Sequence, residues 1–229
     1  MVHPTAVGPA GDDAVSLRNY FLAGPAGRIE CLLKKPGEGA PPRAAAVVCH
    51  PHPLFGGTMH NKTVHAVTGA MLAAGLPVLR FNFRGAGLSD GEHDSGVAEL
   101  EDLGVVIDHL AGLYPSSLLV VAGYSFGAFV GLKGGCRNRR VAALIGIGVP
   151  VSLYDFTFLA GCDKPVAMIQ GERDPFGHPF SLAKLAARTR AGITILPIDG
   201  AGHDLAGHRE ALRQRVVEAL RATIDTLSV

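Results

Sequence analysis

The sequence predicts a doubly wound α/β fold with a mostly parallel sheet. Apolar runs alternate with segments of helical period from residue 44 onward, which is the pattern of repeated strand–helix units. The 229 residues are 48% hydrophobic and only 18% charged, enough apolar material to bury a core without disulfides. No internal repeat or low-complexity linker divides the chain, so we expect one domain over residues 1–229.

The first elements predict an antiparallel hairpin before the parallel sheet. Apolar residues 20–22 and 29–33 flank a Gly-Pro-Ala-Gly turn at residues 24–27. Continuous apolar runs then predict six further strands, because strands covered on both faces do not alternate with polar residues. These runs lie at residues 44–49, 78–83, 118–122, 141–148, 166–170 and 193–198.

Helices are predicted where apolar residues recur at spacings of three and four. The first helix should stop at Gly75 and the second at Pro115. Their apolar faces are Val64, Val67, Met71 and Ala74, then Val97, Leu100, Leu103, Ile107, Leu110 and Tyr114, and in the last helix Leu205, Leu212, Val216, Leu220, Ile224 and Leu227.

Residues 123–127, Gly-Tyr-Ser-Phe-Gly, follow a predicted strand and open a predicted helix. A strand, a sharp turn and a helix with serine at the apex form a nucleophile elbow. Glycines are needed at both flanks, because a β-carbon there would collide with the neighbouring strand and helix. The pattern predicts Ser125 as a nucleophile.

A second Gly-x-Ser-x-Gly match lies at residues 87–91 and centres on Ser89. With 30 glycines in the chain, such matches arise by chance. Asp90-Gly91 reads as a turn and no helix opens at Ser89, so the context favours Ser125.

A serine hydroxyl needs a histidine base, and the histidine needs a carboxylate that fixes its tautomer. Both should follow the serine in the chain and lie in loops at the carboxyl ends of later strands. Asp174, after the strand at 166–170, is the expected acid, and His203, after the strand at 193–198, is the expected base. Weaker alternatives are Glu172, Asp155 and Asp163 for the acid and His208 for the base.

An oxyanion intermediate needs two backbone N–H donors. The first expected donor is Phe126, the residue after the nucleophile. The second should come from the loop after the strand at 44–49, where Pro51 and Pro53 have no N–H, which leaves His52 or Leu54.

The same loop offers a competing interpretation as a metal site. His50 and His52 form a His-x-His pair that could chelate zinc with His60 or His65. Two prolines stiffen the segment and only Cys49 adds a ligand nearby, so we expect neither metal nor cofactor. We expect His50 to brace the loop by side-chain hydrogen bonds.

The order of these pieces resembles the α/β-hydrolase superfamily, and more narrowly small cap-less bacterial serine hydrolases related to dienelactone hydrolase. The resemblance favours His52 over Leu54, because residues 50–53 line up with the His-Gly-x-Pro loops of other α/β-hydrolases. It implies a loop brace rather than a substrate clamp for Arg84. The motifs that carry it are His50-Pro51-His52-Pro53, Gly56-Gly57-Thr58-Met59, Asn61-Lys62 and Phe81-Asn82-Phe83-Arg84-Gly85 with Gly87 and Ser89.

The resemblance implies a serine hydrolase that cleaves small carboxylic esters through an acyl-serine intermediate. Dienelactone hydrolase itself carries a cysteine nucleophile, so Ser125 favours ordinary esters over lactones. Thioesterase, amidase or peptidase and acyltransferase chemistry stay open with the same triad, as does a non-catalytic binding protein of this fold. Residues 149–165, where a cap would be inserted, are too few for a helical lid.

Charge and composition set the expected surroundings. A net charge of +1 gives no basic field for nucleic acid, and the longest apolar run, residues 141–153, is too short to span a membrane. Four scattered cysteines and the absence of an apolar signal segment in residues 1–14 predict a cytoplasmic protein. The expected partner is a small-molecule ester, and a homodimer stays open beside a monomer.

Overall fold

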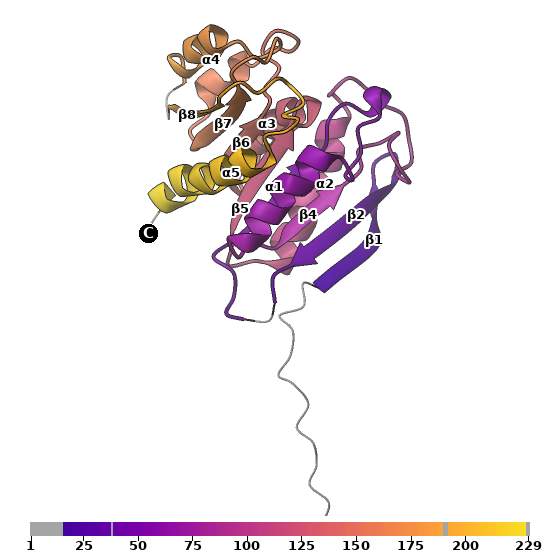
Figure 1. Cartoon of the computed structure of the whole chain (residues 1–229). Coiled ribbons are helices and arrows are strands. Elements are labelled where there is room, and N and C mark those ends of the chain that lie inside the picture. The colour runs from indigo at the N-terminus through magenta and orange to yellow at the C-terminus, as the bar shows by residue number, and fades with distance from the viewer. Residues whose placement is uncertain (1–15, 38, 190–191, 228–229) are drawn as a thin grey trace, which may run out of the picture.

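The computed structural model, which describes residues 16–37, 39–189 and 192–227, contains one eight-stranded sheet in the order β1-β2-β4-β3-β5-β6-β7-β8 (Figure 1). β1 and β2 form an antiparallel hairpin, β2 pairs antiparallel with β4, and the other neighbours are parallel. This confirms the predicted fold class. The strands are β1 (Ser16–Gly24), β2 (Gly27–Lys35), β3 (Ala44–Cys49), β4 (Val78–Phe81), β5 (Leu118–Tyr124), β6 (Val141–Ile147), β7 (Val166–Gly171) and β8 (Ile193–Ile198). Residues 1–14, on which the expectation of no signal segment rests, lie outside the described residues.

Helices cover both faces of the sheet. α1 and α5 pack together on one face, and α2 and α3 pack together on the other (Figure 1). The helices are α1 (Lys62–Ala73), α2 (Glu99–Leu113), α3 (Phe126–Arg137), α4 (Pro179–Ala186) and α5 (Arg209–Ile224), with 3-10 turns η1 (Pro53–Phe55), η2 (Thr157–Gly161) and η3 (Asp225–Leu227).

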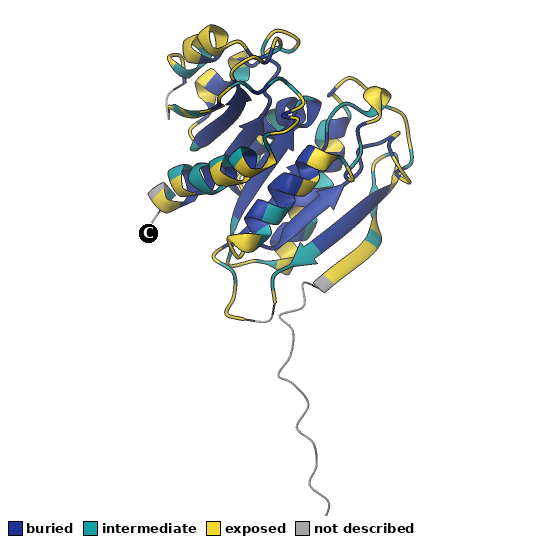
Figure 2. Cartoon of the chain, viewed as in Figure 1, coloured by how far each residue is buried: buried dark blue, intermediate teal, exposed yellow. Residues whose placement is uncertain are grey.

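The middle of the sheet is buried on both sides (Figure 2). In β3, Ala45 and Val47 belong to the core under α2 and α3, whereas Ala46 and Val48 belong to the core under α1 and α5. Alternate strand residues point to opposite faces, so a strand between two helical layers must be apolar at every position. The continuous apolar runs in the sequence reflect this arrangement.

Three predicted boundaries need correction. The strand predicted over 78–83 ends at Phe81. Beyond it, Asn82 Oδ1 and the N–H of Phe83 form hydrogen bonds with loop segments instead of with a neighbouring strand. Val97 lies before α2 and is exposed. The last helix starts at Arg209: Leu205 precedes it with a left-handed φ of 55°, and Leu227 follows it in η3.

No cap covers the carboxyl edge of the sheet. Between β6 and β7 the chain forms only the five-residue turn η2, as the sequence predicted. Within residues 16–37, 39–189 and 192–227, no helix has the length and apolar character needed to span a membrane.

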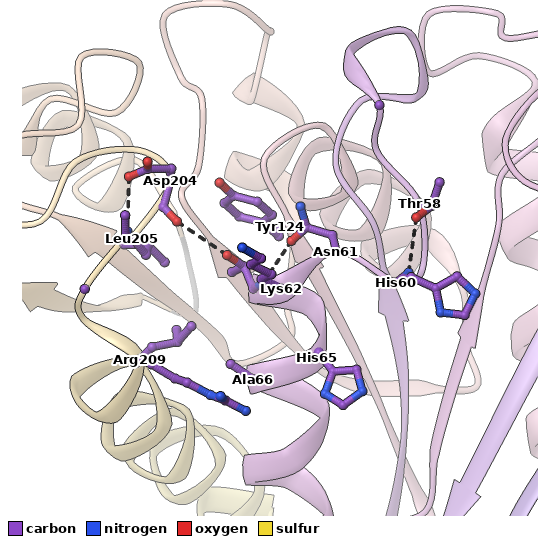
Figure 3. A pocket seen from close by; sticks show the side chains of 15 residues that line it. Thr58, His60, Asn61, Lys62, His65, Ala66, Tyr124, Asp204, Leu205 and Arg209 are labelled. Carbon is purple, nitrogen blue, oxygen red and sulfur yellow. Dashed lines mark hydrogen bonds between the residues drawn. The ribbon is translucent and has the colours of Figure 1, made fainter.

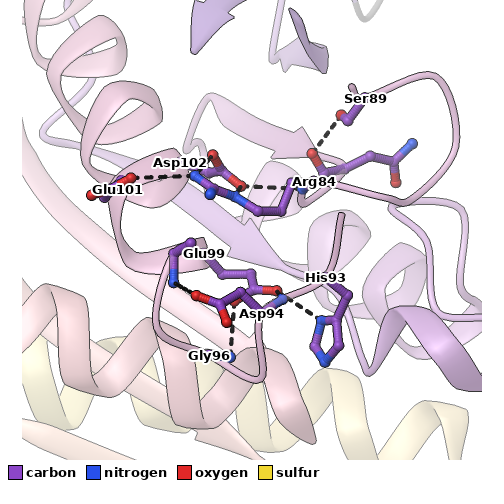
Figure 4. A network of polar contacts seen from close by, with 10 residues as sticks. Arg84, Ser89, His93, Asp94, Gly96, Glu99, Glu101 and Asp102 are labelled. Carbon is purple, nitrogen blue, oxygen red and sulfur yellow. Dashed lines mark hydrogen bonds and ion pairs between the residues drawn. The ribbon is translucent and has the colours of Figure 1, made fainter. Parts of the chain in front are cut away.

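The loop between β4 and α2 is held by a network of buried charges (Figure 4). Arg84 binds Asp102 through Nε and Nη2, at 2.9 and 2.7 Å, and the Asp102 side chain is only 1% exposed. Glu99, fully buried, accepts the N–H groups of Asp94 and Gly96, each at 2.8 Å. These contacts agree with the expectation that Arg84 is a brace, because its guanidinium points to α2.

Replacing Asp102 by Asn should lower the free energy of unfolding by about 3 kcal/mol, because the mostly buried guanidinium of Arg84 loses its buried counter-charge and keeps only the exposed Glu101, at 3.5 Å. Asp108→Asn is the matched control on the same helix. Asp108 pairs with Arg140 at the surface, where both side chains are more than half exposed, so its loss should be under about 1 kcal/mol. Denaturant titration measures both, and equal losses would contradict a bracing role for the buried pair.

Candidate active site

Ser125 occupies the turn between β5 and α3, in a left-handed conformation with φ 56° and ψ −119°. A β-carbon on Gly123 would collide with the carbonyl of Gly127, and one on Gly127 would collide with the carbonyl of His50. A non-glycine residue with positive φ is strained, so the packed strand and helix must hold it there. In this conformation the hydroxyl of Ser125 projects from the carboxyl edge of the sheet.

The structure joins Ser125, His203 and Asp174 by an unbroken chain of hydrogen bonds. Ser125 Oγ lies 2.9 Å from His203 Nε2, and His203 Nδ1 lies 2.8 Å from Asp174 Oδ2. A carboxylate facing Nδ1 holds the proton on that nitrogen, which leaves Nε2 free to accept from the serine hydroxyl. The three residues lie on three separate loops and meet because β5, β7 and β8 run parallel.

Further side chains hold the acid and the base in place. Asp174 is fully buried and accepts hydrogen bonds from Gln170 Nε2 at 2.6 Å and from the Phe176 N–H at 2.9 Å. Tyr124 donates its hydroxyl to the carbonyl of His203 at 3.0 Å, and burial raises the pKa of Tyr124 to about 12. Neither Tyr124 nor Gln170 was predicted from the sequence; the signal that could have found Gln170 is a glutamine near the end of an otherwise apolar strand.

The alternative candidates for the acid and the base are not part of this hydrogen-bond chain. Glu172 accepts the Gly200 N–H at 2.9 Å, and Asp155 accepts both the N–H and the hydroxyl of Thr157. Asp163 is exposed. His208 Nδ1 lies 2.8 Å from the carbonyl of Ala206, immediately before α5.

Ser89, in the second Gly-x-Ser-x-Gly match, is a buried structural residue. Its hydroxyl donates to the carbonyl of Asn82 at 2.7 Å and accepts the Glu30 N–H at 2.9 Å. The bond with Glu30 ties β2 of the hairpin to the loop after β4, and the bond with Asn82 closes that loop on itself. This placement agrees with the choice of Ser125 over Ser89 as the candidate nucleophile.

Two backbone N–H groups are candidates for an oxyanion hole. Phe126 is the first residue of α3, where the N–H has no partner within the helix. In the opposite loop the Leu54 N–H donates to His52 Nδ1 at 3.2 Å, so His52 is the better candidate for the second donor. The rings of His52 and Phe126 contact each other with centroids 4.9 Å apart, which brings the two segments together.

His50 braces the start of this loop from inside the protein. Its Nε2 accepts the Phe83 N–H at 2.9 Å, so Nδ1 carries the proton and donates to the Pro51 carbonyl at 2.6 Å. Burial lowers the pKa of His50 to about 4. With both ring nitrogens bonded to backbone, His50 has none left for the metal considered above. In the described part of the chain, no three His, Cys, Asp or Glu side chains are grouped to hold a metal ion.

The depressed pKa of His50 makes stability depend on pH. Below its ordinary value of 6.5 the unfolded chain takes up a proton, whereas the folded protein resists protonation until about pH 4. Stability is therefore lost as the pH falls through this window, by about 3 kcal/mol in total. Denaturant titrations measure the free energy of unfolding of wild type and of His50→Gln, whose side chain at position 50 cannot titrate. Between about pH 7 and about pH 4, wild type should lose about 3 kcal/mol more than the variant. Parallel curves would contradict the neutral, bracing histidine.

An aromatic cluster lies beside the elbow. Phe129, which the sequence did not single out, contacts Tyr154, Phe156 and Phe158, and Phe126 joins this cluster through Tyr154. Phe129 stacks on Tyr154 with centroids 4.6 Å apart. Two further aromatic residues lie outside this cluster: Phe176 packs edge-on against His203, and Phe55 packs on His52 with 87% of its surface exposed.

The fold and site place the chain in the α/β-hydrolase superfamily, among members without a lid, and solved structures agree. An α/β serine hydrolase homologue from Coxiella burnetii has a TM-score of 0.83 at 32% identity, over 89% of this chain and 97% of that one. A lid-less α/β serine hydrolase from Xanthomonas campestris has a TM-score of 0.81 at 29% identity, over 93% of this chain and 97% of that one.

The particular family follows from the sequence comparison. The model of the family "Serine aminopeptidase, S33" matches residues 40–155, about half of the chain. An uncharacterized protein of Rickettsia prowazekii (strain Madrid E) is 38% identical over 183 residues, which are 78% of this chain and 76% of that protein. The chain therefore belongs to the serine aminopeptidase S33 family, and it is a cap-less hydrolase of the α/β class.

Proposed function

We propose that the protein hydrolyses small carboxylic esters through an acyl-serine intermediate on Ser125, with His203 as base and Asp174 as its orienting acid. The observation that carries the proposal is the continuous hydrogen-bond chain from Ser125 Oγ through His203 to a buried Asp174. Relatives of about 30% identity that are described as serine hydrolases support it.

In the first step Ser125 Oγ attacks the ester carbonyl carbon while His203 Nε2 takes the hydroxyl proton. The resulting oxyanion accepts hydrogen bonds from the N–H groups of Phe126 and His52. The imidazolium, stabilised by ionised Asp174, then protonates the leaving oxygen as the carbon–oxygen bond breaks. A water molecule, deprotonated by His203, then attacks the carbonyl carbon of the acyl-serine. His203 returns the proton to Ser125 Oγ as the carboxylic acid product leaves.

The same geometry serves thioesters, amides and transfer to an acceptor alcohol, because the triad does not select the leaving group. Esters are preferred here because the site has no lid to exclude water or to grip a peptide along its length. Parallel assays on p-nitrophenyl esters, acyl thioesters and aminoacyl p-nitroanilides rank these substrates directly.

Ser125→Ala should lower kcat for p-nitrophenyl acetate by about 10⁴-fold or more, leaving only what binding and the oxyanion hole provide. Ser89→Ala is the matched control, since Ser89 lies in the other Gly-x-Ser-x-Gly match. It should keep kcat per folded molecule and lower the free energy of unfolding by about 1–3 kcal/mol, because two buried bonds lose a partner. Activity that survives at Ser125→Ala and disappears at Ser89→Ala would reverse the assignment.

Short acyl chains should react faster than long ones. Each methylene that a lid would bury contributes about 0.8 kcal/mol of binding, which an open site forgoes. Butyrate and palmitate esters of p-nitrophenol, compared at matched monomeric concentrations, measure the effect. Faster turnover of palmitate, or a sudden rise in rate at its solubility limit, would show that a long apolar cover forms, from the aromatic cluster or from a dimer partner.

A further inference from the structure

A cavity of about 860 Å³ lies beside the proposed catalytic residues, between the starts of α1 and α5 (Figure 3). The link between this lining and the proposed catalytic residues is Tyr124, whose hydroxyl donates to the carbonyl of His203 at 3.0 Å and whose ring stacks on that of His203. In the sequence, Asp204 lies next to His203 and Gly56 lies in the loop of His52. Thr63 Oγ1 donates to the carbonyl of Asp204 at 3.5 Å and joins the two sides. The proposed hydrolytic mechanism uses none of this volume.

Four basic side chains are among the fifteen residues that line the cavity. They are His60, Lys62, His65 and Arg209. Figure 3 shows Arg209 reaching from the start of α5 towards α1. The lining has one acid, Asp204, whose Oδ1 accepts the Ala206 N–H at 3.1 Å.

Among the described residues, no ion pair neutralises Lys62 or Arg209 of this lining. Across residues 16–37, 39–189 and 192–227, the ion pairs involve neither Lys62 nor Arg209, whereas Arg28, Arg84 and Arg215 each bind a carboxylate. The pKa of His65 is lowered, first by burial and then by nearby cations that include Arg80 and Arg209. Two permanently charged side chains that face one cavity attract an anion from solution.

The start of α1 offers an anion no uncapped turn of helix. The first amides of α1 are already occupied, because Asn61 Oδ1 accepts the N–H groups of Thr63 and Val64 at 2.8 and 3.4 Å. An anion in the cavity would therefore meet side-chain cations from two helices. Both cations are exposed and long, so they can converge on a carboxylate or phosphate without moving the backbone.

We propose that this cavity binds an anionic group, a carboxylate or a phosphate, carried by the leaving-group part of the substrate, so that the substrate class is an anionic ester or thioester. The leaving group must lie within reach of His203 Nε2, which protonates it, and the residue next to His203 lines the cavity. The inference rests on the proposed function for the chemistry, but the anion site stands on its own lining.

The test compares acetate esters that differ in the charge of the leaving group. The anionic substrates are 4-acetoxybenzoate and 4-acetoxyphenyl phosphate, and the neutral reference is 4-acetoxybenzamide. The measured quantity is kcat/KM for each anionic ester divided by kcat/KM for the neutral one. In the double variant Lys62→Glu, Arg209→Glu this ratio should fall about tenfold or more, from the loss of two exposed ion pairs and the added repulsion.

Arg137→Glu, Arg139→Glu is the matched control, because it changes the net charge equally. Both residues lie just before β6, at the amino edge of the parallel strands and away from Ser125. The ratio should hold in this variant. In wild type, added NaCl should lower the ratio, since exposed charges are screened, and this measurement needs no variant to fold.

Each result decides between outcomes. A fall for both anionic esters supports a general anion site, and a fall for one alone identifies carboxylate or phosphate as the group. The proposal is overturned if this ratio changes neither in the double variant nor with added salt. If wild type hydrolyses none of the esters, the proposed function fails instead. Binding of phenyl phosphate to Ser125→Ala, measured by calorimetry with and without the Lys62 and Arg209 reversals, then tests the anion site separately: equal or absent binding overturns it.

Discussion

The close approach of backbone at Gly123 and Gly127 is the constraint on which the rest of the site depends. It lets β5 turn into α3 within one residue and forces Ser125 into a left-handed conformation. The same turn leaves the N–H of Phe126 at the start of a helix. Without the two glycines, neither the projected hydroxyl nor the neighbouring donor could occupy the carboxyl edge of the sheet.

The parallel sheet supplies the remaining parts from distant positions in the chain. β7 presents Asp174 and β8 presents His203 at the same edge, while the loop after β3 carries His52 across from Phe126. Gln170 fixes Asp174 by a buried hydrogen bond, and the hydroxyl of Tyr124 holds the backbone of His203. Since the described residues form no cap over this edge, the loops themselves border the site.

The sequence predicted what is tied to strand ends and to forced backbone geometry. Ser125, Asp174 and His203 could be chosen because each follows an apolar run. α4 was not predicted, because it is only eight residues long and Leu182 is its one buried residue. Phe129 was missed because an aromatic residue inside a helix gives no sign of which neighbours it contacts. The charged cavity joins segments some 140 residues apart, and no local pattern reveals such a meeting.

The most direct test of the central claim, an activated nucleophile at Ser125, is labelling with a fluorophosphonate followed by mass spectrometry. Trypsin leaves Ser89 and Ser125 in one peptide, so cleavage after Glu101 is needed to separate them. The account predicts one adduct, localised to Ser125, and a greatly slowed reaction in His203→Gln. An adduct on Ser89, or labelling of Ser125 that does not depend on His203, would contradict it.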